Sequence, residues 1–137
     1  MRGLAERHPG KVAVQLNYDH ALSHQIEAGS DFFLMPSRFE PCGLNQLYSL
    51  RYGAIPIVRR TGGLDDTVVD AADDVSLANG IKFLDPTPQA LAKAIRKALL
   101  LFQDKDLLSR YRTTGMAANF SWSNAVGELE SAYERKG

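Results

Sequence analysis

The sequence of 137 residues has one cysteine, no net charge and no long apolar run. A single cysteine rules out an internal disulfide and fits a reducing compartment. The 16 Lys and Arg residues balance the 16 Asp and Glu residues, whereas proteins that bind nucleic acid or membranes by charge normally show a basic excess. Residues 1–11 lack the apolar core of a signal peptide, and no segment approaches the length of a membrane span. We therefore expect a soluble cytoplasmic protein that binds neither nucleic acid nor membrane.

Short apolar segments alternate with helical patterns over the first part of the chain. The predicted strands are 12–16, 31–35, 54–58 and 80–84. They are almost wholly apolar, as strands of a parallel sheet that is covered on both faces are. Helical patterns at 19–29 and 44–52 lie between them. This alternation predicts an α/β fold, a Rossmann-like parallel sheet with flanking helices.

The last third of the chain is helical. Thr87 and Pro88 form a typical helix start, with Thr87 as N-cap. A second helix is predicted over 105–116, and Ser121 caps a last one over 122–137. The last helix has one apolar stripe, formed by Trp122, Val126, Leu129 and Tyr133. Three helices are more than four short strands need, so they either cover a face of the sheet or reach a part outside this chain.

The segment 37–44 joins a predicted strand to a helix and carries the strongest functional pattern. The backbone N–H groups of Cys42, Gly43 and Leu44, with the helix dipole, can hold a diphosphate at this position. Glu40, just before them, can accept hydrogen bonds from sugar hydroxyls or face a developing positive charge. The alternative is a tight strand-to-helix turn that contains a glycine and an exposed glutamate.

Two further features are predicted at the same edge of the sheet. Thr61, Gly62 and Gly63 follow the next strand, and adjacent glycines allow close approach of a ligand. Tyr18 follows the first strand and can stack on a base or a sugar. The alternatives are a flexible loop and a packed tyrosine at a strand end. The side chains at 59–60 are arginines, which either face an anion or end the strand in solvent.

Metal binding and cysteine chemistry are not expected. His20 and His24 are four residues apart, as in some zinc sites, but position 21 is alanine and no third ligand is evident. Cys42 has no general base placed near it by the sequence. We interpret it as a small residue in the loop.

A family resemblance rests on several blocks of the sequence. They are Ser37-Arg38-Phe39-Glu40-Pro41-Cys42-Gly43-Leu44, Gln46-Leu47-Tyr48, Arg51-Tyr52-Gly53, Pro56, Arg60-Thr61-Gly62-Gly63-Leu64, Asp66-Thr67-Val68 and Phe120-Ser121-Trp122. These blocks closely resemble bacterial glycogen synthase and plant starch synthase, with a match over about 12–133. Tyr48 stands where related retaining transferases carry a second glutamate, which agrees with the glycogen-synthase branch.

The resemblance implies a retaining glycosyltransferase of the GT-B type, which has two Rossmann-like domains. Such an enzyme moves glucose from ADP-glucose to the non-reducing end of an α-1,4-glucan, in the cytoplasm or in a plant plastid. It requires no metal and no other cofactor.

The resemblance also implies roles for particular residues. Glu40 would contact the donor glucose and its positively charged transition state, and Tyr18 would stack on adenine. The amides of 42–44 would hold the diphosphate, and the loop 61–63 would border the donor site. Asn45 stands where many relatives have threonine, and either residue offers a polar group near the phosphate.

The resemblance further implies that residues 1–137 form an incomplete C-terminal domain, without its first two βα units and without the N-terminal domain. Of the strand order 3-2-1-4-5-6, only strands 3, 4, 5 and 6 would be present. Strand 12–16 would then pair directly with 31–35, or two chains would associate through exposed strand edges. The helix 122–137 would pack toward the N-terminal domain.

Such a chain would be inactive by itself. The alternatives are a truncated, non-catalytic nucleotide-binding or assembly module, and a transferase of the same fold with another donor.

Overall fold

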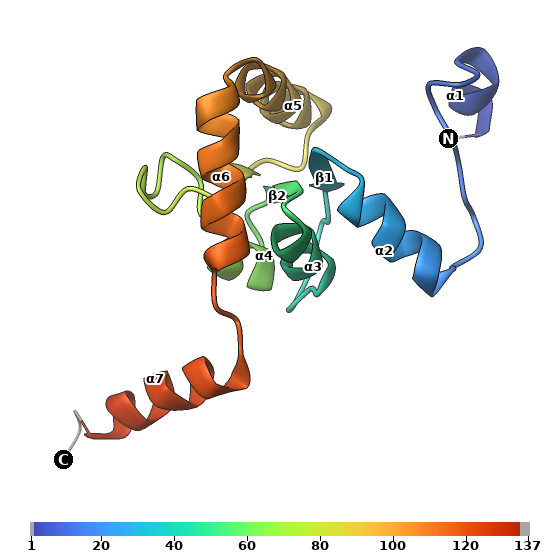
Figure 1. The fold of residues 1–137 in the computed structure, drawn as a ribbon. Helices are drawn as coiled ribbons and strands as arrows, with labels where there is room; N and C mark the ends of the chain where they lie inside the picture. The colour runs from blue at the N-terminus through green and yellow to red at the C-terminus, as the bar shows by residue number, and fades with distance from the viewer. Residues whose placement is uncertain (1, 135–137) are drawn as a thin grey trace.

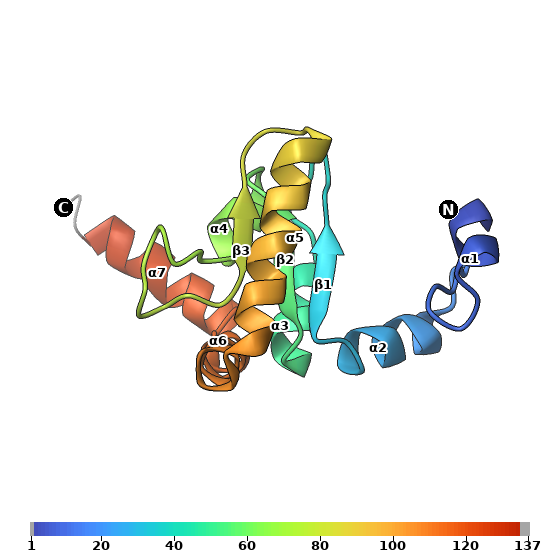
Figure 2. The same ribbon diagram turned by 90° about the horizontal axis from the view of Figure 1, so that it is seen from above.

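The computed structural model describes residues 2–134 and shows a three-stranded parallel sheet with helices on both faces (Figures 1 and 2). The strands lie in the order β1-β2-β3 and span Phe32–Met35, Ile55–Arg59 and Ile81–Phe83. The helices are α1 (Arg2–Arg7), α2 (His20–Ala28), α3 (Asn45–Tyr52), α4 (Gly63–Thr67), α5 (Pro88–Gln103), α6 (Lys105–Ala117) and α7 (Trp122–Glu134). The predicted α/β fold with a parallel sheet is confirmed.

The central strand β2 is buried on both faces. Ile55 and Ile57 pack on one face against α5 and α6, in a core whose other buried members are Ala78, Ile81, Phe83, Ala94, Ala98, Leu101, Leu108 and Tyr111. Val58 packs on the opposite face with Leu64 of α4 and with Val68. This alternation follows from the two-residue period of a strand. Figure 1 shows α5 above the sheet and α3 and α4 below it.

Side-chain caps fix the starts of three helices. Asp19 accepts a hydrogen bond from the Leu22 N–H at 2.9 Å and begins α2. Thr87 accepts one from the Ala90 N–H at 3.2 Å and begins α5, as predicted. Asp104 begins α6 in the same way. Each cap satisfies an N–H group that has no partner inside its own helix.

The predicted strand over 12–16 is wrong in this structure. These residues form no regular element, and β1 pairs only with β2 in the described part of the chain. In the order 3-2-1-4-5-6, strand 3 is no neighbour of strand 4, so an apolar segment at this position has no adjacent edge to pair with. Direct pairing of 12–16 with 31–35 is therefore also wrong, and association of two chains stays a prediction.

The two ends of the chain stand apart from the sheet. Figures 1 and 2 both show α1, with the segment that joins it to α2, on one side and α7 on the other. Trp122 of α7 is 86% exposed. Residues 135–137 and the side chain of Leu129 lie outside the described part. Within residues 2–134, no helix has both the length and the apolar character needed to cross a membrane.

Candidate functional site

Two loops meet at the carboxyl edge of the sheet. The first loop joins β1 to α3 and carries the motif 37–44. The second loop joins β2 to α4 and carries 61–63. Because β1 and β2 are parallel neighbours, both loops leave the sheet at the same edge. The sequence-based placement of these two loops is confirmed.

The two loops contact each other through their backbones. The Gly63 N–H donates a hydrogen bond to the Pro41 carbonyl at 3.2 Å. A Cβ atom on Gly62 would lie 2.2 Å from the Glu40 carbonyl oxygen, and one on Gly63 would lie 2.1 Å from that of Cys42. The packing of the two loops against each other therefore requires glycine at both positions, whether or not a ligand is bound.

Gln46 links the two loops from inside and was not among the predicted site residues. It is fully buried in the first turn of α3. Its Nε2 lies 3.1 Å from the carbonyl oxygens of Cys42 and Gly43 and 3.2 Å from Thr67 Oγ1. The Thr67 hydroxyl in turn donates to the Gly63 carbonyl at 2.5 Å. In the sequence, Gln46 was marked by its place in one of the blocks of the family resemblance, two residues after the motif 37–44.

The start of α3 offers backbone donors. In the described part of the chain, no group accepts a hydrogen bond from the N–H of Cys42, Gly43, Leu44 or Asn45. Gly43 has φ 71°, which is a left-handed backbone conformation that favours glycine. Free N–H groups at a helix N-terminus, with the positive end of the dipole, form a site for an anion.

Glu40 is half-buried at the start of this turn. Its carbonyl is packed against Gly62, which fixes the backbone of Glu40 relative to the second loop. Within residues 2–134, its carboxylate accepts no hydrogen bond and forms no ion pair. The position beside the free N–H groups agrees with the sequence-based expectation, and its role stays a prediction.

Tyr18 is not brought to these loops. It is 82% exposed, and its ring contacts that of His20 at a centroid distance of 6.5 Å. Figures 1 and 2 show the start of α2 away from the sheet. The expected placement of Tyr18 depended on a strand over 12–16, which is not formed here. Stacking of Tyr18 on a base stays a prediction.

The two arginines after β2 are engaged within the chain. Arg59 donates from Nε to the Ser37 carbonyl at 2.9 Å and from Nη2 to the Arg38 carbonyl, so it holds the first loop in place. Arg60 pairs with Asp65 and Asp73. The hydrogen bond that Arg60 donates to the Asp73 carboxylate raises the pKa of Arg60. Both arginines are thus bound to groups of this chain, Arg59 to carbonyls of the first loop and Arg60 to two carboxylates, and neither is a free strand end in solvent.

A buried lysine extends the ion-pair network. Lys82 Nζ lies 2.7 Å from carboxylate oxygens of both Asp65 and Asp73. Hydrogen bonds from Lys82 and then Arg60 hold the pKa of Asp73 far below its usual range. The network connects β3 to α4 and to the segment 70–74, and so supports the second loop from behind.

The two histidines of α2 are part of a packed aromatic group. The rings of His20 and His24 lie 4.6 Å apart, and His24 Nδ1 lies 3.4 Å from the Tyr52 hydroxyl and 3.6 Å from Glu27 Oε2. Burial raises the pKa of Glu27, and His24 opposes this. Among the residues that the structure describes, no group of three His, Cys, Asp or Glu side chains could hold a metal ion. The expectation that no metal is required stays a prediction.

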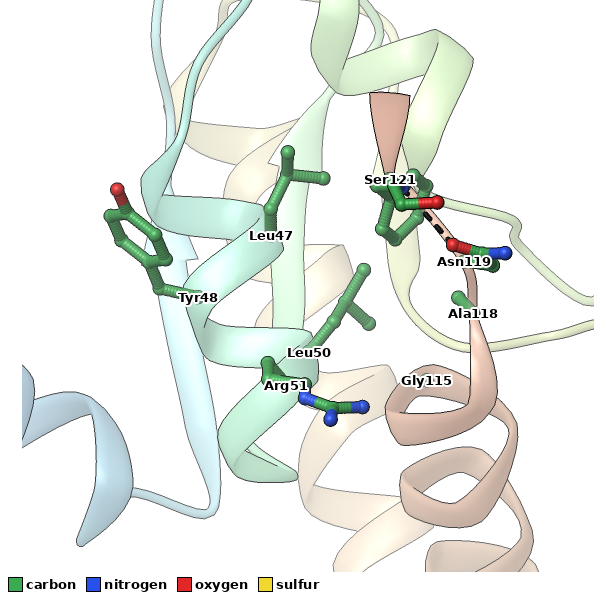
Figure 3. A pocket seen from close by; sticks show the side chains of 9 residues that line it. Leu47, Tyr48, Leu50, Arg51, Gly115, Ala118, Asn119 and Ser121 are labelled. Carbon is green, nitrogen blue, oxygen red and sulfur yellow. Dashed lines mark hydrogen bonds between the residues drawn. The ribbon is translucent and has the colours of Figure 1, made fainter. Parts of the chain in front are cut away.

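A cavity of about 400 Å³ lies between α3 and the end of α6 (Figure 3). Leu47, Leu50 and Arg51 of α3 form one wall, and Gly115 of α6 with the segment 118–121 forms the other. None of the predicted site residues lines it. We therefore place the candidate site at the two loops and not in this cavity.

The fold is the C-terminal Rossmann-like part of a GT-B glycosyltransferase. The family model of group 1 glycosyl transferases matches residues 8–114, and the chain belongs to this family. The glycogen synthase of Thioalkalivibrio sulfidiphilus is 55% identical over 137 residues, and that of Koribacter versatilis is 50% identical over 135 residues. The matches cover 97% and 98% of this chain but 28% of each relative.

Solved structures support the same placement. The catalytic domain of starch synthase IV from Arabidopsis thaliana, bound to ADP and acarbose, matches with a TM-score of 0.83 at 38% identity. The match covers 98% of this chain and 28% of that one. Sucrose-phosphate synthase from Thermosynechococcus elongatus, at 23% identity and a TM-score of 0.65, shares the fold. The resemblance to glycogen and starch synthases is thus confirmed, while the roles of individual site residues stay predictions.

Proposed function

We propose that this chain forms the donor-binding half of a synthase that transfers glucose from ADP-glucose to the non-reducing end of an α-1,4-glucan, with retention of configuration. The main support is the set of free backbone N–H groups at the start of α3, on the edge where parallel sheets bind ligands. The similarity to glycogen synthases and to a starch synthase bound to ADP and acarbose supports the choice of donor and acceptor.

The diphosphate would be held by neutral donors in this half of the site. The N–H groups of Cys42, Gly43 and Leu44 supply hydrogen bonds, and α3 adds its dipole. Arg59 and Arg60 are engaged with the loop and with acidic residues. Neither of these two guanidinium groups is therefore free to neutralise the diphosphate.

Glu40 would act on the sugar. Glu40 comes two residues before the proposed diphosphate site, and its carboxylate has no partner in the described part of the chain, so it is free to face a donor glucose. A fixed negative charge there stabilises positive charge that develops at the anomeric carbon as the bond to the diphosphate breaks. Catalysis then depends on positioning and electrostatics.

Calorimetric titration of the chain with ADP tests the half-site. We expect binding in the micromolar range, equal with and without excess EDTA. Gly43→Val should abolish it, because the new Cβ would lie 2.5 Å from Gln46 Oε1. Gly10→Val is the matched control, since Gly10 has a similar φ of 74° but no neighbour within 4 Å. No binding at millimolar ADP would contradict the proposed half-site.

Two comparisons separate the proposal from its alternatives. Tighter binding of UDP than of ADP would indicate a transferase of the same fold with another donor. ADP binding without transfer, when the chain is placed in a complete synthase, would indicate a non-catalytic nucleotide-binding module.

A further inference from the structure

We propose that Gln46 and Thr67 form a positioning unit that turns three backbone N–H groups toward the donor diphosphate. The proposal rests on the proposed function for the identity of the ligand. The geometry of the unit itself comes from hydrogen bonds within the chain. Neither residue is proposed to contact the donor.

Three consecutive carbonyl groups of the first loop accept hydrogen bonds from Gly63 and Gln46. The Pro41 carbonyl accepts a hydrogen bond from the Gly63 N–H at 3.2 Å. The carbonyls of Cys42 and Gly43 both lie 3.1 Å from Gln46 Nε2. All three therefore face the interior, toward α3 and the second loop.

The direction of each N–H group follows from the planar trans peptide bond. In such a bond, the carbonyl of one residue and the N–H of the next point in opposite directions, and no peptide bond in the described part of the chain is cis. When the carbonyls of 41–43 face inward, the N–H groups of 42–44 must face outward. This explains why those N–H groups have no acceptor among residues 2–134.

Thr67 connects this arrangement to the second loop. Its hydroxyl lies 3.2 Å from Gln46 Nε2 and donates to the Gly63 carbonyl at 2.5 Å. Gly63 is the residue whose N–H holds the Pro41 carbonyl. A closed set of contacts thus fixes both loops together through two side chains.

The orientation of the Gln46 amide is set by its surroundings. Nε2 faces two carbonyl oxygens, so exchange of the nitrogen and the oxygen would bring three acceptors together. Oε1 is buried without a partner and lies 2.5 Å from the position that a Cβ of residue 43 would take. Residue 46 must therefore be a donor of this length, and residue 43 must lack a Cβ.

ADP binding to the full chain tests the unit. Gln46→Glu keeps the size of the side chain but replaces the donor by an acceptor, and we expect the Kd for ADP to rise about tenfold or more. Thr67→Val should raise the Kd several-fold, and Thr67→Ser should restore it because the hydroxyl returns. Gln103→Glu, which makes the same charge change at the far end of α5, should leave the Kd unchanged. An unchanged Kd in both Gln46→Glu and Thr67→Val would overturn the proposal.

NMR order parameters test the unit without any ligand. The amides of 42–44 should have values of about 0.85 in the wild-type chain and below about 0.6 in Gln46→Met and Thr67→Val. Unchanged order parameters in both variants would overturn the positioning role. An ordered wild-type loop that binds no ADP would contradict the proposed function, while the variants would still decide whether Gln46 and Thr67 position the loop.

Discussion

Gly62 and Gly63 leave just enough room for the backbone of the neighbouring loop. Added Cβ atoms would lie 2.2 and 2.1 Å from carbonyl oxygens, which are parts of the backbone and cannot turn away as a side chain can. Gly62 also has φ 44°, which strains any residue with a side chain. Single atoms thus decide how closely the two loops of the site can approach.

Gly63→Ala should lower the free energy of unfolding by about 2 kcal/mol or more, because the methyl group overlaps Cys42. Urea unfolding followed by circular dichroism measures the change. Gly127→Ala in α7, where a Cβ would have no neighbour within 4 Å, is the control and should be neutral or slightly stabilising. Equal stability of Gly63→Ala and the wild type would show that the loops are not packed as described.

Glu40→Gln should separate binding from transfer. The substitution keeps the size of the side chain and removes its charge, so ADP should bind to the chain with an unchanged Kd. Glucose transfer, measured with the chain placed in a complete synthase, should fall about a hundredfold or more, since a charge that faces the transition state is lost. Normal glucose transfer by Glu40→Gln would contradict the role of Glu40 at the sugar.

The ion-pair network between β3, α4 and the segment 70–74 supports the second loop. Lys82 is almost fully buried and pairs with Asp65 and Asp73. Arg60 pairs with the same two carboxylates from the end of β2. Lys97 of α5 pairs with the buried Asp70. Burial alone would raise the pKa of Asp70, but hydrogen bonds from Lys97 and from two backbone N–H groups lower it overall.

Low pH should weaken this ion-pair network. The pKa of Asp73 is lower in the folded chain than its usual value of 3.8, so the folded state binds fewer protons than the unfolded state in acid. The stabilisation is complete above about pH 4 and is lost as the pH falls below that value. Asp73→Asn should therefore be less stable than the wild type at neutral pH and lose less stability on acidification.

Urea unfolding at a series of pH values, from neutral to about pH 2, measures both differences. Asp85→Asn, on the exposed turn after β3, is the control and should follow the wild type. Parallel curves for Asp73→Asn and the wild type would contradict the proposed contribution of Asp73.

Elements with a strong local signal could be predicted from the sequence. The apolar segments at 31–35, 54–58 and 80–84 became β1, β2 and β3, and Thr87 caps α5 as expected. The segment 12–16 has the same apolar signal but forms no strand, because a strand also needs a neighbour to pair with. Local pattern cannot report whether that neighbour is present.

The candidate site was predicted in part. The loops at 37–44 and 61–63 could be placed because each follows a strand of one parallel sheet. The Gln46–Thr67 link could not, because 21 residues separate its members and no local pattern joins their two blocks. Such a contact depends on how the folded backbone brings the two loops together.

At the scale of the whole molecule, the chain spans 28% of the length of the relatives it matches. β1 is an edge strand, and α7 extends from the body with Trp122 and Tyr133 exposed. Packing of the helix 122–137 toward an N-terminal domain stays a prediction, as does association of two chains along the edge of β1. Both surfaces are expected to be covered when the chain is part of a complete synthase.

Glucose transfer by a chimaeric enzyme is the most direct measurement. This chain would replace the matching segment of the Thioalkalivibrio sulfidiphilus glycogen synthase, to which it is 55% identical over the aligned residues. We expect the chimaera to transfer glucose from ADP-glucose to glycogen at a rate comparable to that of the parent, and Glu40→Gln to abolish most of this activity. A chimaera that folds and binds ADP but transfers no glucose would contradict the proposed function.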